Sequence, residues 1–285
     1  MTDQQVLEST THLDPLGFAV RTLTAGEGPP VLLLHGNPDS ADEWREVIAR
    51  LQGRFRCIAP DFPGYGRSPR PPASFAYDRA ALMAFVDAVL NAHGVSEPVI
   101  LVVHDVGGFV GTPWAAANLP RVRGVVFTNT VAFEGFRWFY VAQRWGADSP
   151  LGRQRARLMM ALLGLFGGAL FRRAFGAQSP ELSPEVLGRM TRQFGANPVA
   201  KDATLRQFRH AVRDDYFAGF DALNRELTEA RPVRVVWGTG DVFIPDKFAS
   251  CFGSAPVTLL DGVGHWVPIL AASEVADAIA EVAGA

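Results

Sequence analysis

The sequence predicts an α/β protein with a mostly parallel sheet flanked by helices on both faces. Short apolar runs of strand length alternate along the chain with segments of helical apolar spacing, which is typical of that class. The composition agrees, because 48% hydrophobic and 20% charged residues over 285 residues is usual for a compact globular protein. We therefore expect an ordered enzyme-sized domain with no fibrous or disordered character.

The expected elements follow in order along the chain. Strands are predicted at residues 31–34, 57–59, 99–103, 122–127, 233–237 and 257–260. Helices are predicted at 42–51, 77–92, 109–118 and 273–282, where apolar residues recur with helical spacing. Two separated parts of the sequence therefore build the sheet.

The interval 131–230 differs in character from the rest of the chain. It is rich in arginine, phenylalanine and tryptophan and contains no clear strand. Arg231-Pro232 marks the return to the sheet, because proline readily opens a strand. We predict a core made of residues 1–130 and 231–285, with a helical cap at 131–230 inserted between two of its strands.

The overall charge argues for a small-molecule substrate. With 27 basic and 29 acidic residues the net charge is -2, which gives no long-range attraction to nucleic acid or acidic lipid. Cys57 and Cys251 form no metal or disulfide pattern, and the histidines show no ligand spacing, so we expect neither a metal nor a cofactor. Water and a small apolar substrate are the expected partners, without nucleic acid or membrane.

The predicted compartment is the cytoplasm, because the first residues, MTDQQVLESTTHLD, lack the basic start and apolar run of a secretory signal. The longest apolar run covers 14 residues, 158–171, which is too short to cross a bilayer. We interpret it as a core or cap helix in preference to a membrane-surface contact.

The segment His104-Asp105-Val106-Gly107-Gly108 places an acid directly between a predicted strand and a predicted helix. Such a turn can hold a nucleophile outward and aim backbone N–H groups at the reacting atoms. The same Asp105 could instead be a strand-end residue that caps the helix. The motif alone does not choose between these readings.

Further motifs follow other predicted strands. His35-Gly36-Asn37-Pro38 follows the first strand, and the run from Asp61 to Ser68 follows the second. Near the carboxyl end, Asp241 and His265 each follow a strand. The order nucleophile, acid, histidine is that of α/β hydrolases.

Together these motifs resemble the α/β-hydrolase superfamily, and specifically its aspartate-nucleophile branch of epoxide hydrolases and haloalkane dehalogenases. The resemblance spans about residues 30 to 270 and departs from the usual G-x-nucleophile-x-G pattern at Val103. It implies an α/β-hydrolase fold with a catalytic triad of Asp105, Asp241 and His265. It also implies an oxyanion hole formed by the backbone of Asn37 and Val106.

An aspartate nucleophile sets the expected reaction. Its carboxylate is ionised at neutral pH, with an ordinary pKa of about 3.9, and can attack a saturated carbon without a base. The product is an alkyl ester of Asp105. Water activated by His265, which Asp241 orients, then hydrolyses that ester.

The substrate is less well specified. Haloalkane dehalogenases resemble the chain at Asn37, whose side chain helps to hold halide in many of them, but their second donor follows the nucleophile, where this chain has Val106. Trp138, Trp145 or Trp266 could replace it.

Epoxide hydrolases use cap tyrosines as proton donors, and the corresponding position here is Phe208. Tyr140, His210 and Tyr216 remain as possible donors in the interval, and the aromatic residues around Tyr140 could line an apolar pocket. We favour an epoxide hydrolase over a haloalkane dehalogenase. A noncatalytic relative that binds a small ligand stays open as an alternative of another class.

Overall fold

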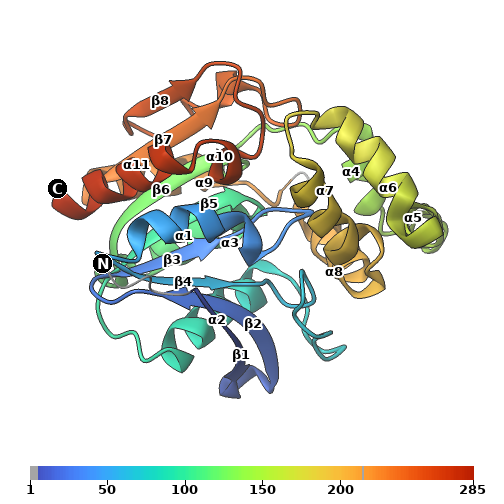
Figure 1. The fold of residues 1–285 in the computed structure, drawn as a ribbon, viewed down its shortest axis with the longest axis horizontal. Helices are drawn as coiled ribbons and strands as arrows, with labels where there is room; N and C mark the ends of the chain where they lie inside the picture. Colours follow the sequence, from blue (N-terminus) through green and yellow to red (C-terminus); the bar gives the residue numbers. More distant parts are fainter. Residues whose placement is uncertain (1–5, 214) are drawn as a thin grey trace.

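The structure is a computed structural model that describes residues 6–213 and 215–285. These residues form an eight-stranded sheet in the order β1-β2-β4-β3-β5-β6-β7-β8 (Figure 1). β1 and β2 pair antiparallel, as do β2 and β4, and every later pairing is parallel. The predicted mostly parallel α/β fold is confirmed.

The strands are β1 (Leu7–Leu13), β2 (Phe18–Ala25), β3 (Pro30–Leu34), β4 (Arg56–Pro60), β5 (Val99–Asp105), β6 (Val122–Thr130), β7 (Val233–Gly238) and β8 (Val257–Leu260). The α-helices are α1 (Arg45–Leu51), α2 (Arg79–Ala92), α3 (Val106–Ala117), α4 (Tyr140–Trp145), α5 (Pro150–Leu163), α6 (Leu165–Gln178), α7 (Pro184–Met190), α8 (Pro198–Ala211), α9 (Phe220–Ala230), α10 (Val267–Leu270) and α11 (Ala272–Gly284). Short turns of other helix types are η1 (Asp14–Leu16), η2 (Ala41–Trp44), η3 (Leu119–Arg121), η4 (Thr191–Gly195) and η5 (Asp246–Phe248).

Helices cover both faces of the sheet because its strands are apolar on both sides. Along β5, Ile100 and Val102 join the cluster that packs beneath α1 and α11, whereas Leu101 and Val103 join the cluster beneath α2 and α3. Successive side chains of a strand point to opposite faces. A continuous apolar run is therefore the sequence of a strand buried on both faces.

The antiparallel pair β1–β2 was not predicted. In β1, LESTTHL, five of seven residues are polar or charged and the first four are exposed, so no apolar run marks the strand. The pair lies at the edge of the sheet, with β1 as its outermost strand. Residues 1–5, which form part of the argument for the compartment, lie outside the described residues, and the cytoplasm stays a prediction.

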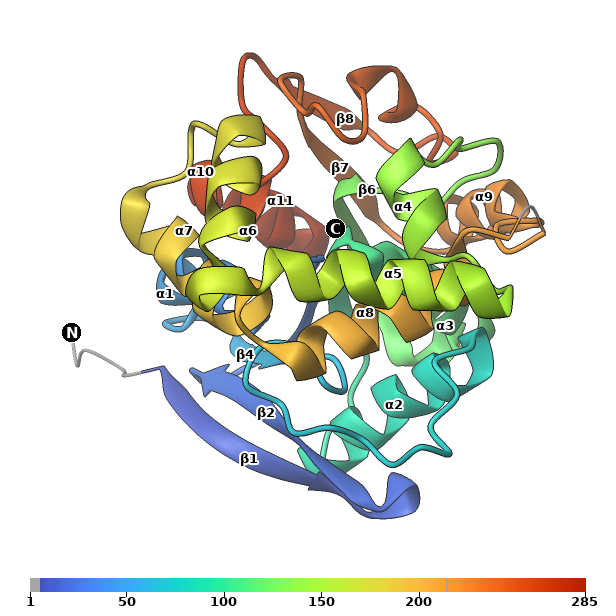
Figure 2. The same cartoon turned by 90° about the vertical axis from the view of Figure 1, so that its right-hand side faces the viewer.

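The segment between β6 and β7 contains α4 to α9 and, in its described residues, no strand. Figures 1 and 2 show α4 to α8 grouped at one end of the sheet, with α5 outermost, whereas α9 packs against α3 on the sheet itself. The division into a core and a cap at 131–230 stays a prediction. α9 contacts the core helix although it falls inside the predicted cap.

The apolar run 158–171 is divided between two helices. α5 ends at Leu163 and α6 begins at Leu165, with left-handed backbone at Phe166, Gly167 and Gly168. Within the described residues, no single helix has the length and apolarity needed to span a membrane, and α5 with α6 meets that criterion only as a pair bent by 92°. The expected single helix was therefore wrong.

Candidate active site

The turn between β5 and α3 holds Asp105 in a strained conformation. Its φ is 47° and its ψ is -116°, in a region that non-glycine residues rarely occupy. The turn is tight, because a Cβ at Gly107 would lie 2.3 Å from the Leu34 oxygen, and one at Gly108 would lie 2.0 Å from Thr130 Oγ1. Thr130 also donates to the Asp105 backbone oxygen at 2.5 Å. This packing fixes the backbone of Asp105 at the end of β5.

The three predicted triad residues come together. His265 Nδ1 lies 2.7 Å from Asp241 Oδ2, and His265 Nε2 lies 3.9 Å from Asp105 Oδ2. Asn129 donates to Asp241 Oδ2 at 2.7 Å. The backbone N–H groups of Phe243 and Ile244 donate to Asp241 Oδ1 at 2.7 and 2.9 Å. Asp241 is thus fixed as the partner that orients the imidazole.

The charges of the two aspartates act on His265. Burial lowers the pKa of His265, but the charge and hydrogen bond of Asp241, together with the charge of Asp105, outweigh it and raise the pKa to about 8. Burial raises the pKa of Asp241, and the same contact with His265 brings it below its usual value. The free site therefore favours an imidazolium between two carboxylates.

The loop after β3 supplies a donor to Asp105. The backbone N–H of Asn37 donates to Asp105 Oδ1 at 2.7 Å. His35 anchors this loop, because its Nδ1 lies 2.7 Å from the Gly36 oxygen and its Nε2 accepts from the Phe62 N–H at 2.8 Å. Val106 opens α3, where backbone N–H groups have no acceptor within the helix. Both expected oxyanion positions therefore flank Asp105.

The side chain of Asn37 is oriented from the segment between β6 and β7. Thr204 Oγ1, on α8, donates to Asn37 Oδ1 at 2.8 Å. That contact assigns the amide oxygen toward α8 and leaves Nδ2 as a donor, with no acceptor among the residues the structure describes. Thr204 was not predicted as a site residue, because the contact depends on how α8 sits over the core.

A buried Glu43–His104 pair lies behind the catalytic histidine. His104 Nε2 lies 3.0 Å from the backbone oxygen of His265, so this nitrogen carries the hydrogen of a neutral ring. Its Nδ1 lies 3.0 Å from Glu43 Oε1, which must then donate as a carboxylic acid. Burial raises the pKa of Glu43 well above its usual value and lowers the pKa of His104 to about 3, in agreement with a neutral pair. Glu43 had no signal in the sequence beyond an acid near a helix start.

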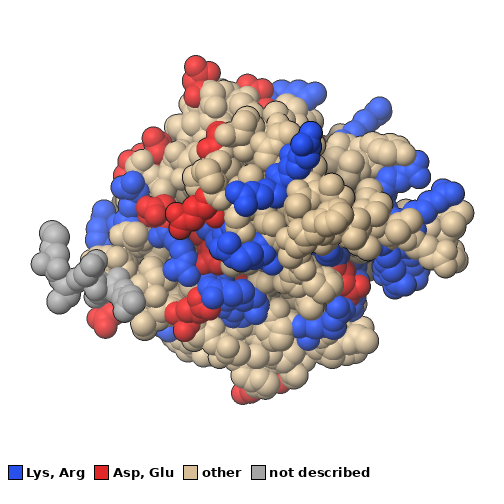
Figure 3. Space-filling model, turned by 45° about the vertical axis from the view of Figure 1, so that its right-hand side comes forward, with Lys and Arg blue, Asp and Glu red and all other residues tan. Residues whose placement is uncertain are grey.

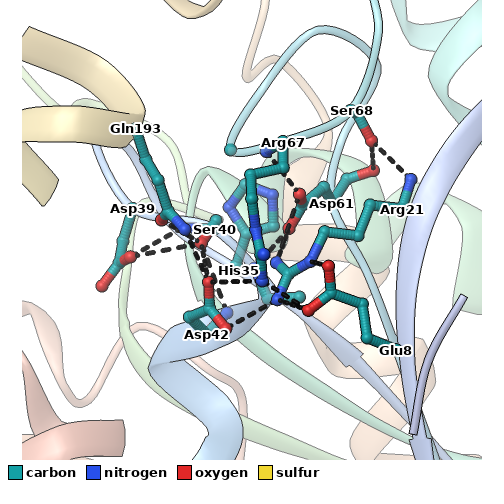
Figure 4. A network of polar contacts seen from close by, with 12 residues as sticks. Glu8, Arg21, His35, Asp39, Ser40, Asp42, Asp61, Arg67, Ser68 and Gln193 are labelled. Carbon is teal, nitrogen blue, oxygen red and sulfur yellow. Dashed lines mark hydrogen bonds and ion pairs between the residues drawn. The ribbon is translucent and has the colours of Figure 1, made fainter. Parts of the chain in front are cut away.

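A polar network lies beside the loop that follows Asn37 (Figure 4). Arg21, which is 3% exposed, contacts Asp42 at 2.7 Å, Asp61 at 3.1 Å and Glu8 at 3.1 Å. Because three carboxylates surround one guanidinium, β2 is tied to the edge strand β1 and to the loops after β3 and β4. The run that begins at Asp61 therefore has a structural role.

The same network reaches helices between β6 and β7. Gln193 Nε2 donates to Asp42 Oδ2 at 2.7 Å, and Ser40 Oγ donates to Gln193 Oε1 at 2.8 Å. Arg189 lies 2.6 Å from Asp39 Oδ2. A cleft of about 630 Å³ opens beside these residues, and most of its lining residues are polar or charged, with no triad residue among them. It is not the apolar pocket that the sequence led us to expect.

The expected proton donors contact residues outside the triad. The Tyr140 side chain is 67% exposed and lies against the Arg144 guanidinium. Tyr216 is buried against Phe109, Phe217 and Arg79. His210 Nε2 lies 3.1 Å from the Ala76 backbone oxygen. Among the described residues, no hydrogen bond joins any of the three to the triad, and their role as proton donors stays a prediction.

The aromatic residues expected to contact the substrate differ in whether their indole N–H groups are already hydrogen-bonded. Trp138 Nε1 donates to the Ala211 oxygen at 2.9 Å and Trp266 Nε1 donates to Ser179 Oγ at 3.2 Å, so neither indole N–H is free. Phe208 packs between Trp138 and Trp145, at ring distances of 5.2 and 5.5 Å. The indole N–H of Trp145 is buried without a hydrogen-bond partner in the described structure.

Comparison with known proteins assigns the family. A family model described as alpha/beta hydrolase fold matches residues 29–272. The chain belongs to the α/β-hydrolase fold family. The predicted superfamily is confirmed, and relatives with names such as haloalkane dehalogenase support the prediction of an enzyme of the hydrolase type.

Curated relatives match this α/β hydrolase over part of its length. A cis-3-alkyl-4-alkyloxetan-2-one decarboxylase from Xanthomonas campestris pv. campestris is 36% identical over 125 residues, covering 41% of this chain and 42% of the relative. A haloalkane dehalogenase from Agrobacterium fabrum is 37% identical over 115 residues, covering 40% of this chain and 37% of the relative. The matches thus span about two fifths of these relatives.

Among solved structures, the epoxide hydrolase CorEH without ligand superposes with a TM-score of 0.79 and 20% identity, over 98% of this chain and 99% of that one. At that identity the likeness concerns the fold.

In residues 6–213 and 215–285, no group of three His, Cys, Asp or Glu side chains is placed to hold a metal ion.

Proposed function

We propose that Asp105 is a nucleophile that displaces a leaving group from a saturated carbon and that His265 then activates water to hydrolyse the resulting ester. The proposal rests mainly on the different surroundings of the two carboxylate oxygens of Asp105. Oδ1 accepts the Asn37 backbone N–H at 2.7 Å, whereas Oδ2 lies 3.9 Å from His265 Nε2, beyond hydrogen-bond distance. Oδ2 is therefore the oxygen free to attack.

This difference fits both half-reactions. In the first, Asp105 Oδ2 forms a bond to carbon and the leaving group departs with the electron pair of the broken bond. In the second, water loses a proton to His265 Nε2 and attacks Asp105 Cγ, which drives negative charge onto Oδ1, already held by the Asn37 N–H. The Cγ–Oδ2 bond then breaks, Oδ2 takes the proton from His265, and the alcohol leaves.

The charge of Asp105 also couples the two steps. It helps to raise the pKa of His265 in the free enzyme. Ester formation neutralises Asp105, so the pKa of His265 falls and the neutral imidazole needed as a base becomes more abundant. The base is thus made available when the ester is present.

The two candidate leaving groups, an epoxide oxygen and a halide, differ in whether they need a proton donor. An epoxide oxygen needs a proton as the ring opens, and the three residues expected to provide one, Tyr140, Tyr216 and His210, form no hydrogen bond with the triad among the described residues. A halide departs as an anion and needs only hydrogen-bond donors. We therefore propose a haloalkane dehalogenase type of activity, in place of the epoxide hydrolase that the sequence favoured.

Two donors support this choice. Asn37 Nδ2 is oriented by Thr204 and has no described acceptor. The Trp145 indole N–H is buried without a partner, and its ring packs on Phe208, one helical turn from Thr204 on α8. The relative from Agrobacterium fabrum carries the name haloalkane dehalogenase. The aromatic rings of Phe208, Trp145 and Trp138 favour an apolar alkyl group.

The test compares 1-bromohexane with 1,2-epoxyhexane, measuring bromide release and diol formation. We expect bromide release. Asn37→Ala should lower it by about 10- to 100-fold, because the side-chain donor is lost while the backbone donor stays. Asn91→Ala, a substitution of the same type at an exposed site on α2, should leave it unchanged.

Two other results would favour the alternatives to a haloalkane dehalogenase. Diol formation without bromide release would establish the epoxide hydrolase instead. Turnover of neither compound, together with retained binding of hexyl compounds by Asp105→Asn, would favour the noncatalytic ligand-binding alternative.

A further inference from the structure

The outer face of α5 is apolar and exposed. Leu151, Leu158 and Leu162 are 56%, 61% and 47% exposed, and their spacing places them on one side of the helix. Ala156 and Met160, on the opposite side, are buried at 2% each. α5 packs over α8 and forms the outermost layer at that end of the molecule (Figure 2). The apolar stripe therefore faces away from the protein.

The stripe continues around the bend into α6. Leu165, Phe166 and Leu170 are 45%, 85% and 40% exposed. Phe166 lies at the corner itself, where the chain turns by 92° between the two helices. The exposed leucines of α5, the corner and the first turn of α6 together form one projecting edge, which we call the α5–α6 edge (residues 151–170).

Positive charge surrounds this edge. Residues 150–178 contain five arginines, at 153, 155, 157, 172 and 173, and no acidic residue, although the whole chain has a net charge of -2. Arg153 pairs with Asp148, and among the described residues none of the other four forms an ion pair. Figure 3 shows basic side chains gathered at this end of the molecule. Burial lowers the pKa of the Arg209 guanidinium, and the charges of Arg153 and Arg157 lower it further.

We propose that the α5–α6 edge binds the surface of an anionic lipid bilayer. A helix face with exposed leucine and phenylalanine flanked by arginine is the pattern of an interfacial segment, in which the apolar side chains enter the headgroup region and the cations contact lipid phosphates. A second copy of this chain is a poorer occupant, because pairing two such edges would bring arginines of both copies together. The edge lies on the surface of the bilayer and does not span it.

This inference differs from the sequence-based expectation of no membrane partner. That expectation depended on overall charge and on the length of the apolar run, and neither reports which side chains are exposed. The inference does not depend on the nature of the nucleophile. It would place the enzyme at an interface where apolar substrates concentrate.

The experiment is co-sedimentation of the full chain with vesicles of phosphatidylcholine alone or mixed with phosphatidylglycerol. We expect binding to the anionic vesicles, weakened by added salt. Leu158→Ser/Leu162→Ser and Arg155→Gln/Arg157→Gln should each weaken it by about tenfold or more. The controls are Leu259→Ser, which removes a leucine that is 54% exposed on β8, and Arg50→Gln, an exposed site on α1; both should bind as the wild type does.

Three results would overturn the inference. They are no binding to anionic vesicles, equal weakening by the control variants, or a dimer in sedimentation velocity that Leu158→Ser/Leu162→Ser disperses. The last would show that the edge is covered by a second copy. Circular dichroism of each variant checks that the fold is retained.

Discussion

His265 Nε2 lies 3.9 Å from Asp105 Oδ2, close enough for the two charges to interact and too far for a hydrogen bond. The separation leaves the Asp105 oxygen without a donor on that side. It also makes the protonation of His265 depend on the charge of Asp105, because that charge helps to raise the histidine pKa to about 8. The proposed two-step reaction uses both consequences.

The first prediction concerns this coupling. Asp105→Asn removes the charge and should lower the pKa of His265 from about 8, as measured by NMR titration of its ring protons. Asp277→Asn, at an exposed position of α11, should leave it unchanged. An unchanged His265 pKa in Asp105→Asn would mean that neutralising Asp105 by ester formation does not lower the pKa of the histidine.

The second prediction concerns Glu43. Glu43→Gln should cost about 1 kcal/mol, because its amide nitrogen can replace Glu43 Oε1 as the donor to His104 Nδ1 but cannot accept the Gly36 N–H. Glu43→Ala should cost about 1–3 kcal/mol, since His104 Nδ1 and the Gly36 N–H lose their partner. Urea unfolding measures both, with Glu46→Ala as the exposed control. Equal losses for Gln and Ala would contradict a protonated Glu43.

The third prediction concerns pH. His35 and His104 are buried with pKa values lowered to about 3, so the unfolded chain binds protons below about pH 6.5 and the folded chain does not. Their contribution to stability is therefore present above pH 6.5 and is lost as the pH falls toward 3. His265, whose pKa is raised to about 8, acts in the opposite sense: its contribution is complete below pH 6.5 and is lost as the pH rises through 8.

Urea unfolding followed by circular dichroism at pH 7, 6 and 5 checks this. The lowered pKa of His35 should remove about 2 kcal/mol between about pH 6.5 and 5, whereas the loss from His104 is offset because Glu43 is protonated in the folded chain and ionised in the unfolded one. His35→Gln, which keeps one donor and one acceptor, should reduce the slope, whereas His12→Gln, at an exposed site, should not. A slope unaffected by His35→Gln would remove this histidine from the explanation.

The fourth prediction concerns Arg21. Arg21→Leu should destabilise the fold by about 3–5 kcal/mol, because the buried carboxylates of Asp42 and Asp61 lose their counter-charge. Arg50→Leu, on the exposed side of α1, is the matched control. Chemical unfolding of the two variants gives the comparison, and a loss no larger than that of the control would show that the network contributes little.

The parallel strands and the turn that holds Asp105 were predictable because their sequence signals are local. A strand buried on both faces is marked in the sequence by a continuous apolar run, as in β5. Asp105 is the polar residue at the end of that run. The motifs that carry Asp241 and His265 likewise end strands. Parallel strands bring their carboxyl ends to one edge of a sheet, so the three residues were expected to meet.

What the sequence did not predict depends on long-range placement. The polar strand β1 forms because β2 offers it an edge, and Thr204 reaches Asn37 only because α8 lies over the loop after β3. Tyr140 and Phe208 are both aromatic and both in the predicted cap, yet one is 67% exposed and the other 3%. Helical spacing does not set how a short helix is positioned against the core.

The most direct measurement of the central claim is the intact mass of His265→Ala after incubation with 1-bromohexane and, separately, with 1,2-epoxyhexane. Loss of the water-activating base should trap the ester, giving a mass increase of one hexyl group in place of hydrogen, located by peptide mapping at Asp105 and absent from His265→Ala/Asp105→Asn. An adduct of the whole epoxide at the same residue would keep the nucleophile and change the substrate class. A folded variant that acquires neither adduct would contradict the proposal that Asp105 is a nucleophile.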